Sequence, residues 1–356
     1  MENRTMTRMG NQFPAFLSLT RRHLKVFFKN IPTVIFTMMV PLTIFAVYLL
    51  FLRNIQIGEL QNYYPGFEDL PELTQSRIMA LADSWMISGV LGVSCVTVSM
   101  NCQYIMVKDK ENQLNRDMIS SPINPNVIMS SYFVFNVIVT FLINLLVFFV
   151  AMIILVINGA YLISALDFFA LIGIILYSTV VASLFSFLVA SFVNTEAVMS
   201  PLIAICCAAI GFLIGAYLPY KMMPEYINNL TAFFPGTYSV GLFRHFLMAP
   251  QVAQLLADPD IVANGVDVFV KSLGEQFNIY CAQNAGGWDV YVAIHFFSLD
   301  VNPGYMNFAL FVFSILLLIA DLIALHFKKF VAMNNNAIRK VKEHREKQRD
   351  DRVNKN

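Results

Sequence analysis

The chain has 356 residues, of which 57% are hydrophobic and 13% are charged, with a net charge of +1. A soluble domain has about 25% charged residues, and its apolar residues are dispersed along the chain. Here they fall in blocks long enough to cross a bilayer, which takes roughly 20 residues of helix. The composition therefore excludes an ordinary soluble protein and indicates an integral membrane protein without a nucleic-acid partner.

The segment 1–30 contains the sequence "NQFPAFLSLTRRHLKVFFKN", which predicts an amphipathic helix. Such a helix lies in the plane of the membrane interface, with its rings at the acyl boundary and its cations at the headgroups. Two interpretations stay open together, a membrane anchor and an entry helix that touches a cytoplasmic partner. The apolar face holds Phe13, Phe16, Leu17, Leu24, Phe27 and Phe28, and the polar face holds Ser18, Arg21, Arg22, Lys25 and Lys29.

Six apolar segments predict six transmembrane helices, so we expect an all-α integral membrane protein. A β-barrel would show alternating strands of about ten residues, whereas runs such as "FLINLLVFFVAMIILVI" are apolar on every face. The predicted spans are Ile31–Leu52, Met86–Val107, Tyr132–Ile157, Phe168–Val193, Ala197–Leu218 and Asn307–Phe327.

The distribution of basic residues predicts the orientation. Of the 24 Lys and Arg residues, 19 lie in the N-terminal segment, in the loop after the second span or in the tail 328–356. Basic residues stay cytoplasmic, so we expect both termini in the cytoplasm. We expect no cleavable signal, because the apolar core of the first span is too long and follows about thirty residues.

A polar stretch, "KENQLNRDMISSPINP", separates the second and third spans. It predicts a short cytoplasmic helix within 108–122 that ends at Ser121-Pro122. A solvated connector would need only a few residues, whereas a helix with an apolar knob and a charged rim suits docking into a groove on another protein. The knob is Leu114, Met118 and Ile119, and the rim includes Glu111, Asn115, Arg116 and Asp117.

The segment 219–248 holds two near-apolar halves, Tyr226–Phe234 and Thr237–Met248, around Pro235-Gly236. Neither half is long enough to span, so together they predict a re-entrant hairpin that enters the membrane from outside. Two interfacial helices lying flat are the alternative. The following insertion, 249–306, predicts two short helices broken at Asp258-Pro259-Asp260, and with the acidic loop from Arg53 to Asp83 it predicts an outer cap.

In their order and spacing, these features resemble the permease, or membrane subunit, of a type-2 ATP-binding-cassette (ABC) exporter. The resemblance covers nearly the whole chain. It implies six spans with an amphipathic entry helix, a cytoplasmic coupling helix and an outer re-entrant hairpin. The coupling helix would be carried by Glu111, Asn115, Met118, Ser121 and Pro122, and the hairpin by Pro219, Pro224, Pro235, Gly236, Tyr238 and Arg244.

The chain contains no motif for catalysis. The phosphate-binding pattern G-x-x-x-x-G-K-[ST], the zinc pattern H-E-x-x-H and the nucleophile pattern G-x-S-x-G are all missing. We therefore expect no catalytic residue, metal or cofactor in this chain. The resemblance implies a separate nucleotide-binding ATPase that carries ATP and Mg²⁺, a second permease chain, identical or different, and a bacterial plasma membrane.

A secondary transporter or channel remains the competing class. It would need ionisable groups inside the membrane, and Asp321 is the one acidic residue well inside a predicted span. A packing or ion-pair role for Asp321 is favoured over a proton relay. The polar residues Asn101, Asn136 and Asn144 either line a path or hold helices together through hydrogen bonds.

The resemblance favours a drug-like or amphipathic lipophilic substrate, as in the multidrug and antibiotic-resistance branch of these exporters. The alternative within the family is an exporter of lipid-linked polysaccharide or teichoic acid.

Overall fold

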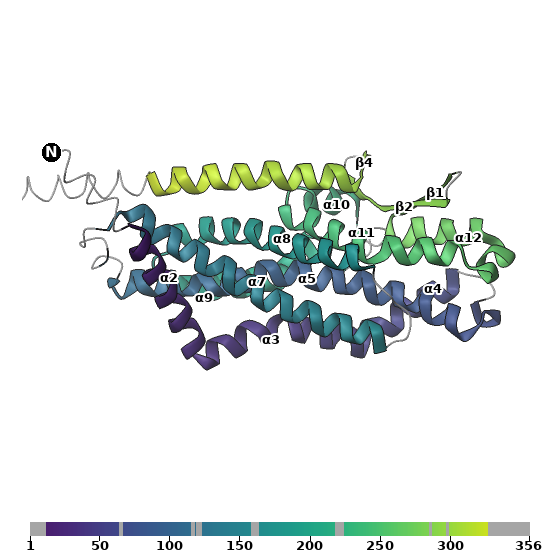
Figure 1. Ribbon diagram of the computed structural model, residues 1–356, viewed down its shortest axis with the longest axis horizontal. Helices are drawn as coiled ribbons and strands as arrows, with labels where there is room; N and C mark the ends of the chain where they lie inside the picture. The colour runs from purple at the N-terminus through teal and green to yellow at the C-terminus, as the bar shows by residue number, and fades with distance from the viewer. Residues whose placement is uncertain are drawn as a thin grey trace, which may run out of the picture.

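The computed structural model describes residues 12–63, 67–114, 118, 123–157, 164–217, 224–284, 287–296 and 299–326. It is an elongated helical bundle with a small β region at one end (Figure 1). The elements are α2 (Gln12–Lys29), α3 (Ile31–Val47), the π-helix η1 (Tyr48–Leu52), α4 (Arg53–Tyr63), the 3₁₀ helix η2 (Phe67–Asp69), α5 (Glu72–Glu111), α7 (Pro125–Ile157), α8 (Ala165–Phe192), α9 (Glu196–Leu213), α10 (Glu225–Thr231), α11 (Pro235–Leu256), α12 (Pro259–Phe277), β1 (Ile279–Asn284), β2 (Gly287–Val292), β3 (Ile294–Phe296), β4 (Leu299–Val301) and a C-terminal helix, Pro303–His326.

Six helices in the described part of the chain are long and apolar enough to cross a membrane, and each coincides with a predicted span. The six-span prediction is confirmed at this level. The candidate spans are Ile31–Phe51, Glu72–Glu111, Pro125–Ile157, Ala165–Phe192, Glu196–Leu213 and Pro303–His326.

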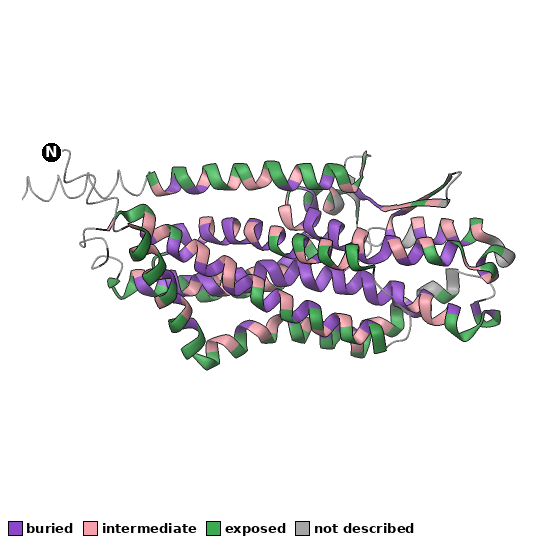
Figure 2. Cartoon of the chain, viewed as in Figure 1, coloured by how far each residue is buried: buried purple, intermediate pink, exposed green. Residues whose placement is uncertain are grey.

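Helix α5 is the centre of the bundle. At 40 residues it is about 60 Å long, and it packs against α3, α7, α8, α9 and α11. It passes through two hydrophobic clusters, one that includes Leu81 and Leu91 and one that includes Val98 and Met106. In Figure 2 it is buried along almost its whole length, whereas α3 and the C-terminal helix turn exposed apolar residues outward. A central helix of this kind is positioned to transmit displacement between the two ends of the bundle.

Helix α5 is longer than the predicted second span, because it begins at Glu72 and not near Met86. Its first turns contain Gln75 and Arg77, whose polarity lowers the hydropathy although both are good helix formers. Their other face is apolar and buried, with Ile78 and Leu81 in the core. The segment predicted as a loop, Arg53 to Asp83, is therefore largely helical, as α4 and the first turns of α5.

Two buried aspartates mark the two ends of the apolar part of α5. Asp83 binds the Arg53 guanidinium at 2.8 Å, and Asp109 binds the Arg22 guanidinium at 2.8 Å. Between Ser84 and Val107 the helix carries no charged residue, which is about 36 Å of helix. This length suits a bilayer whose hydrocarbon core is about 30 Å thick. We refer to the two ends of the bundle as the Asp83 end and the Asp109 end.

Helix α11 runs antiparallel to the part of α5 nearest the Asp83 end. Gly92 of α5 lies against Val240, and Gln251 reaches Ser84 at 2.7 Å. Helix α11 continues to Leu256, beyond Met248, where the second half of the predicted hairpin ends. The helix continues because Val252 and Leu255 are buried in the same cluster as the residues before them. At 22 residues, α11 is also longer than the short half-segment that was predicted.

The structure corrects the all-α prediction within the segment 249–306. After α12 the chain forms two antiparallel strand pairs, β1 with β2 and β3 with β4. Alternating aromatic and β-branched residues favour strands, and the rings of the paired residues Tyr280 and Tyr291 stack with centroids 5.3 Å apart. A left-handed Asn278, with φ 56°, ends α12 and directs the chain into β1. The helix break at Asp258 and Pro259 lies where it was expected.

Candidate functional site at the Asp109 end

The last turn of α5 leads into the stretch that was predicted to dock a partner. Helix α5 ends at Glu111, and Gln113 has a left-handed backbone with φ 60°. Residues 108–111 therefore belong to α5, and a helix within the predicted range 108–122 can begin only after Gln113, because this conformation stops α5. Beyond it, Leu114 is 39% exposed and Met118 is half-buried against the cluster that includes Val98 and Met106. The other predicted docking residues, Asn115, Arg116, Asp117, Ile119, Ser121 and Pro122, lie outside the described residues.

Asp109 joins three helices at this end. Its two carboxylate oxygens accept from Arg22 of α2 at 2.8 and 3.3 Å, and one of them also accepts from the Tyr132 hydroxyl of α7 at 2.6 Å. The carboxylate is almost fully buried. A bidentate guanidinium–carboxylate pair fixes orientation as well as distance. Helix α2 is thus held in a fixed orientation against the end of α5.

His23 forms the second part of the contact between α2 and α7. Its ring stacks on Tyr132 with centroids 4.0 Å apart, and its Nε2 lies 3.2 Å from the Ser131 hydroxyl. Burial lowers the pKa of His23 to about 4 from its usual 6.5, and the Arg22 charge acts in the same direction while Asp109 opposes it. The imidazole is therefore neutral at pH 7 and packs as an aromatic ring.

The predicted division of α2 into an apolar and a polar face is partly wrong. The side that packs on the bundle carries Thr20, His23 and Phe27, and Arg22 is turned toward Asp109 instead of the headgroups. Phe16 is half-buried, whereas Phe13, Leu17 and Phe28 are exposed beside the exposed cations Arg21 and Lys25. This exposed strip of rings and cations still has the composition of an interfacial helix.

The residues next to Asp109 bind the other two helices that meet at this end. Lys110 donates to the carbonyls of Ala190 and Val193 at 2.6 and 3.1 Å, at the C-terminus of α8. Glu111 accepts from the backbone N–H of Glu196 at 2.6 Å, at the N-terminus of α9. Each charge has the sign that the helix dipole favours. The last turn of α5 is therefore bonded to α2, α7, α8 and α9 together.

Within the bundle the three asparagines bind helices to one another or to themselves. Asn136 of α7 donates to the hydroxyls of Ser99 on α5 and Ser186 on α8 at 3.0 and 3.1 Å. Asn144 and Asn101 each donate to a carbonyl four residues earlier in their own helix. Ser99 and Ser186, which sequence reasoning missed, complete the network at 2.6 Å. Of the three asparagines, Asn136 joins different helices, as the helix-holding interpretation predicts, whereas these bonds of Asn144 and Asn101 stay within one helix.

The hairpin residues lie at the Asp83 end and in the middle of the bundle. Pro235 begins α11, Tyr238 donates to the Ala232 carbonyl at 2.9 Å, and Gly236 lies close to Ile214. Arg244 is buried, with its guanidinium carbon 4.5 Å from the centre of the Trp85 ring, and it donates to the Gly215 carbonyl at 2.7 Å. Pro224 immediately precedes α10, and Pro219 lies outside the described residues.

Comparison with known proteins decides the family. Residues 14–248, more than half of the chain, match the family described as ABC-2 type transporter. The chain belongs to the ABC-2 type transporter family. Its members' membrane domain is a permease and not the ATPase, ATP binding lies in a separate nucleotide-binding domain, and these permeases work with an ABC ATPase. No curated protein and no solved structure matches the chain.

The matched region begins in α2 and ends within α11. It includes the whole Asp109 cluster and the turn after α5. It leaves out α12 and the four strands at the Asp83 end, and also the C-terminal helix, which is the sixth candidate span. The contacts at the Asp109 end are thus part of the matched permease region.

Proposed function

We propose that this permease exports a lipophilic or amphipathic compound, such as a drug or an antibiotic, from the cytoplasm or the inner leaflet. In this proposal an ABC ATPase docks at the Asp109 end, which faces the cytoplasm together with both termini. Closure of the ATPase shifts the permease between inward-facing and outward-facing states, and two permease chains, identical or different, enclose the path. A ligand moves such an equilibrium only through its different affinities for the two states.

The observation that carries this proposal is the bonding of the last turn of α5. A partner that moves the turn after Glu111 pulls on α5 directly, and through Asp109, Lys110 and Glu111 it pulls on four other helices. Leu114 and Met118 lie just beyond this turn, and Leu114 is exposed to a partner. The Asp109 end therefore has both a surface that a partner can bind and side-chain bonds that transmit the movement to the other helices.

The alternatives are separated by what drives transport and what is transported. A secondary transporter would need a working intramembrane acid, and Asp321 is buried without a hydrogen-bond partner among the described residues. Membership of the ABC-2 family favours ATP as the energy source instead. An exporter of lipid-linked polysaccharide or teichoic acid remains the alternative substrate class, and transport of labelled substrates into vesicles distinguishes the two.

The docking surface is tested by placing charge on it. We expect Leu114→Asp with Met118→Asp to reduce co-purification with the ABC ATPase by at least about tenfold, because losing one desolvated apolar anchor costs about 2 kcal/mol or more. ATP hydrolysis stimulated by the permease should fall in parallel. Both are measured on the full chain with its ATPase in nanodiscs.

The control places the same charges at the Asp83 end. Val262 and Val268 of α12 are exposed apolar residues, so Val262→Asp with Val268→Asp should leave association and hydrolysis unchanged. Thermal unfolding of both double variants shows that the fold is retained. Undiminished association of the Leu114/Met118 variant would overturn the proposed docking surface.

A further inference from the structure

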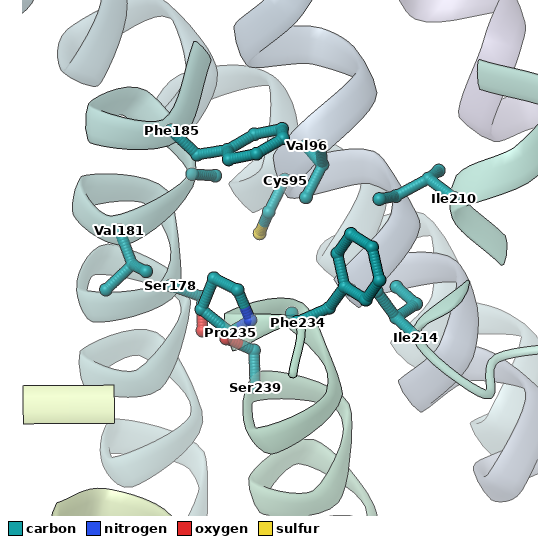
Figure 3. A pocket seen from close by; sticks show the side chains of 13 residues that line it. Cys95, Val96, Ser178, Val181, Phe185, Ile210, Ile214, Phe234, Pro235 and Ser239 are labelled. Carbon is teal, nitrogen blue, oxygen red and sulfur yellow. The ribbon is translucent and has the colours of Figure 1, made fainter. Parts of the chain in front are cut away.

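The helices around α5 are closely packed in this conformation. Figure 3 shows the space between α5, α8, α9 and the hairpin tip, which is lined by side chains such as Cys95, Phe185 and Phe234. Its volume is about 20 Å³, which leaves room for about one water molecule. A permease that changes between two states therefore needs an element that can change its own shape, and the first span contains one.

The first span is interrupted by one π-helical turn. Helix α3 continues directly into η1, Tyr48–Leu52, and η1 continues directly into α4. The backbone N–H of Arg53 donates to the carbonyl of Tyr48, which lies five residues earlier instead of the usual four. Turns of this kind are rare, occur mostly as single turns inside α-helices, and are frequent at functional sites. The turn holds one residue more than regular α-helical bonding would place there.

The π-turn brings Tyr48 and Arg53 to the same carboxylate. The Tyr48 hydroxyl donates to the buried Asp83 of α5 at 3.0 Å, and the Arg53 guanidinium donates to both oxygens of Asp83 at 2.8 and 3.2 Å. In an α-helix, residues five positions apart point about 140° away from each other, so the two side chains would face different sides. The bond across five residues reduces this angle. The π-turn and the pairing with Asp83 therefore depend on each other.

Conversion of this turn to α-helical bonding would rotate every residue after it by about 100° relative to α3. Arg53 would then leave Asp83, while Tyr48, which begins the turn, would stay. Ile57 of α4, which is buried in the cluster that includes Leu81, would turn away from α5. Loss of the guanidinium from a buried carboxylate opposes the conversion, whereas the return to regular α-helical bonding favours it. Two forms of the turn are thus opposed by different interactions.

We propose that η1 is a conformational switch between the first span and α5. In the present state π-helical bonding holds Arg53 on Asp83, and in the other state α-helical bonding releases Arg53 and rotates α4. Helix α4 contacts α12, so the rotation reaches the part of the protein beyond Asp83. As a transition within the first span the switch stands by itself, whereas its use in a transport cycle rests on the export function proposed above.

The switch is tested by deleting Leu50, a residue of the turn that is 69% exposed. Arg53 then follows Tyr48 by four positions, so regular α-helical bonding places both on Asp83, and the released form is lost. We expect hydrogen exchange of the amides in 48–57 to slow at least about tenfold, because this local transition no longer opens them. Mass spectrometry of the full chain in nanodiscs measures the exchange. Leu50→Ala keeps the chain length and should exchange like the wild type.

A second variant changes the balance without changing the chain length. Asp83→Asn weakens the attachment of Arg53, so exchange in 48–57 should become at least about tenfold faster, and this comparison decides if the deletion variant does not fold. Asp83→Asn combined with the deletion of Leu50 should exchange as slowly as the deletion alone. Fast exchange in the combined variant would show general loosening and overturn the switch. Equal exchange in the wild type and both single variants would also overturn it.

A further measurement asks whether the transport cycle uses the switch. With the ABC ATPase in nanodiscs, the deletion variant should keep its association with the ATPase but lose most of the ATP hydrolysis that the permease stimulates, and Leu50→Ala should keep both. Unchanged stimulation in a deletion variant with slowed exchange would overturn the role in the cycle. If the Leu114 and Met118 variants show no role in coupling, the export function fails while the exchange results are unaffected.

Discussion

The buried negative charge of Asp109 is compatible with a stable fold only because other side chains pair with it. It is buried at the end of α5, and Arg22 and Tyr132 together donate three hydrogen bonds to it. A buried carboxylate without its counter-charge is strongly destabilising, whereas the intact pair contributes little net stability. The pair therefore specifies how α2 meets the bundle more than it stabilises the chain.

The pair can be tested by removing the cation alone. We expect Arg22→Met to destabilise the protein by roughly 1–3 kcal/mol, because Asp109 stays buried with one partner fewer. Adding Asp109→Asn should recover part of that loss, so the two changes should be non-additive in thermal unfolding. Arg21→Met, at an exposed neighbouring position, should change stability by less than about 0.5 kcal/mol.

His23 gives this end of the protein a dependence on acid. Its pKa of about 4 lies below the usual 6.5, so below pH 6.5 the unfolded chain binds a proton that the folded chain does not. The stability present at pH 7 therefore falls as the pH drops from 6.5 toward 4, by about 2 kcal/mol at pH 5. We expect His23→Gln to flatten the change in melting temperature between pH 7.5 and 5, and His326→Gln, at an exposed site, to leave it unaltered. Equal slopes in all three proteins would contradict the assignment.

At the scale of elements, helix contacts in the middle of the bundle depend on small residues of α5. A methyl group added at Gly89 would meet the Ala216 carbonyl oxygen at 2.7 Å, and one added at Gly92 would meet Val240 at 2.2 Å. Both glycines thus permit the hairpin and the segment before it to approach α5 closely.

Alanine substitution should destabilise the protein at Gly89, which is closely packed, and not at Gly173 of α8, which is open. We expect Gly89→Ala to cost roughly 1–3 kcal/mol, because the obstacle is backbone that cannot rotate away. Gly173→Ala on α8 meets nothing within 4 Å, so the better helix propensity of alanine should raise stability by up to about 1 kcal/mol. Thermal unfolding in one detergent measures both. A Gly89→Ala protein as stable as Gly173→Ala would show that α5 and this segment are not closely packed.

Hydropathy was sufficient for the six spans, because lipid-facing and buried segments are both apolar at the lengths a membrane requires. Hydropathy did not predict where a helix continues beyond the membrane into a polar segment. The polar first turns of α5, around Gln75 and Arg77, carry a helical pattern that a hydropathy window averages away. The β1–β2 pair had a signal, since "IYCAQN" and "GWDVYV" flank a glycine turn sequence.

The contacts of the candidate site were not accessible from sequence. Arg22 and Asp109 are 87 positions apart, and the local sequence around either residue does not predict that the two form a pair. The same holds for Lys110 and the end of α8, 80 positions further on. Local composition placed these charges at the membrane boundary, but their pairing depends on how whole helices pack.

At the scale of the molecule, the Asp109 end and the Asp83 end should lie on opposite sides of the membrane. Lys25 of α2 and Gln254 of α11 are both exposed, one near each end, and the natural cysteines are buried or half-buried. We expect a membrane-impermeant maleimide to label Gln254→Cys in intact cells and Lys25→Cys only after permeabilisation. The opposite pattern would reverse the orientation and contradict docking of a cytoplasmic ATPase at the Asp109 end.

The length of α5 has a consequence for how this permease could be observed. The helix continues from the Asp109 end to Glu72, beyond Asp83, where Thr74 and Arg77 bind Asp258 between α11 and α12. A rigid rod of about 60 Å that tilts by about 10° displaces its far end by about 10 Å. Binding of a partner at the Asp109 end would then displace α12 and the strands by a similar distance. An antibody fragment that binds only one position of α12 and the strands would therefore detect whether the proposed ATPase partner holds nucleotide. Because linkage is reciprocal, the same fragment would change the affinity of that ATPase for nucleotide across the membrane.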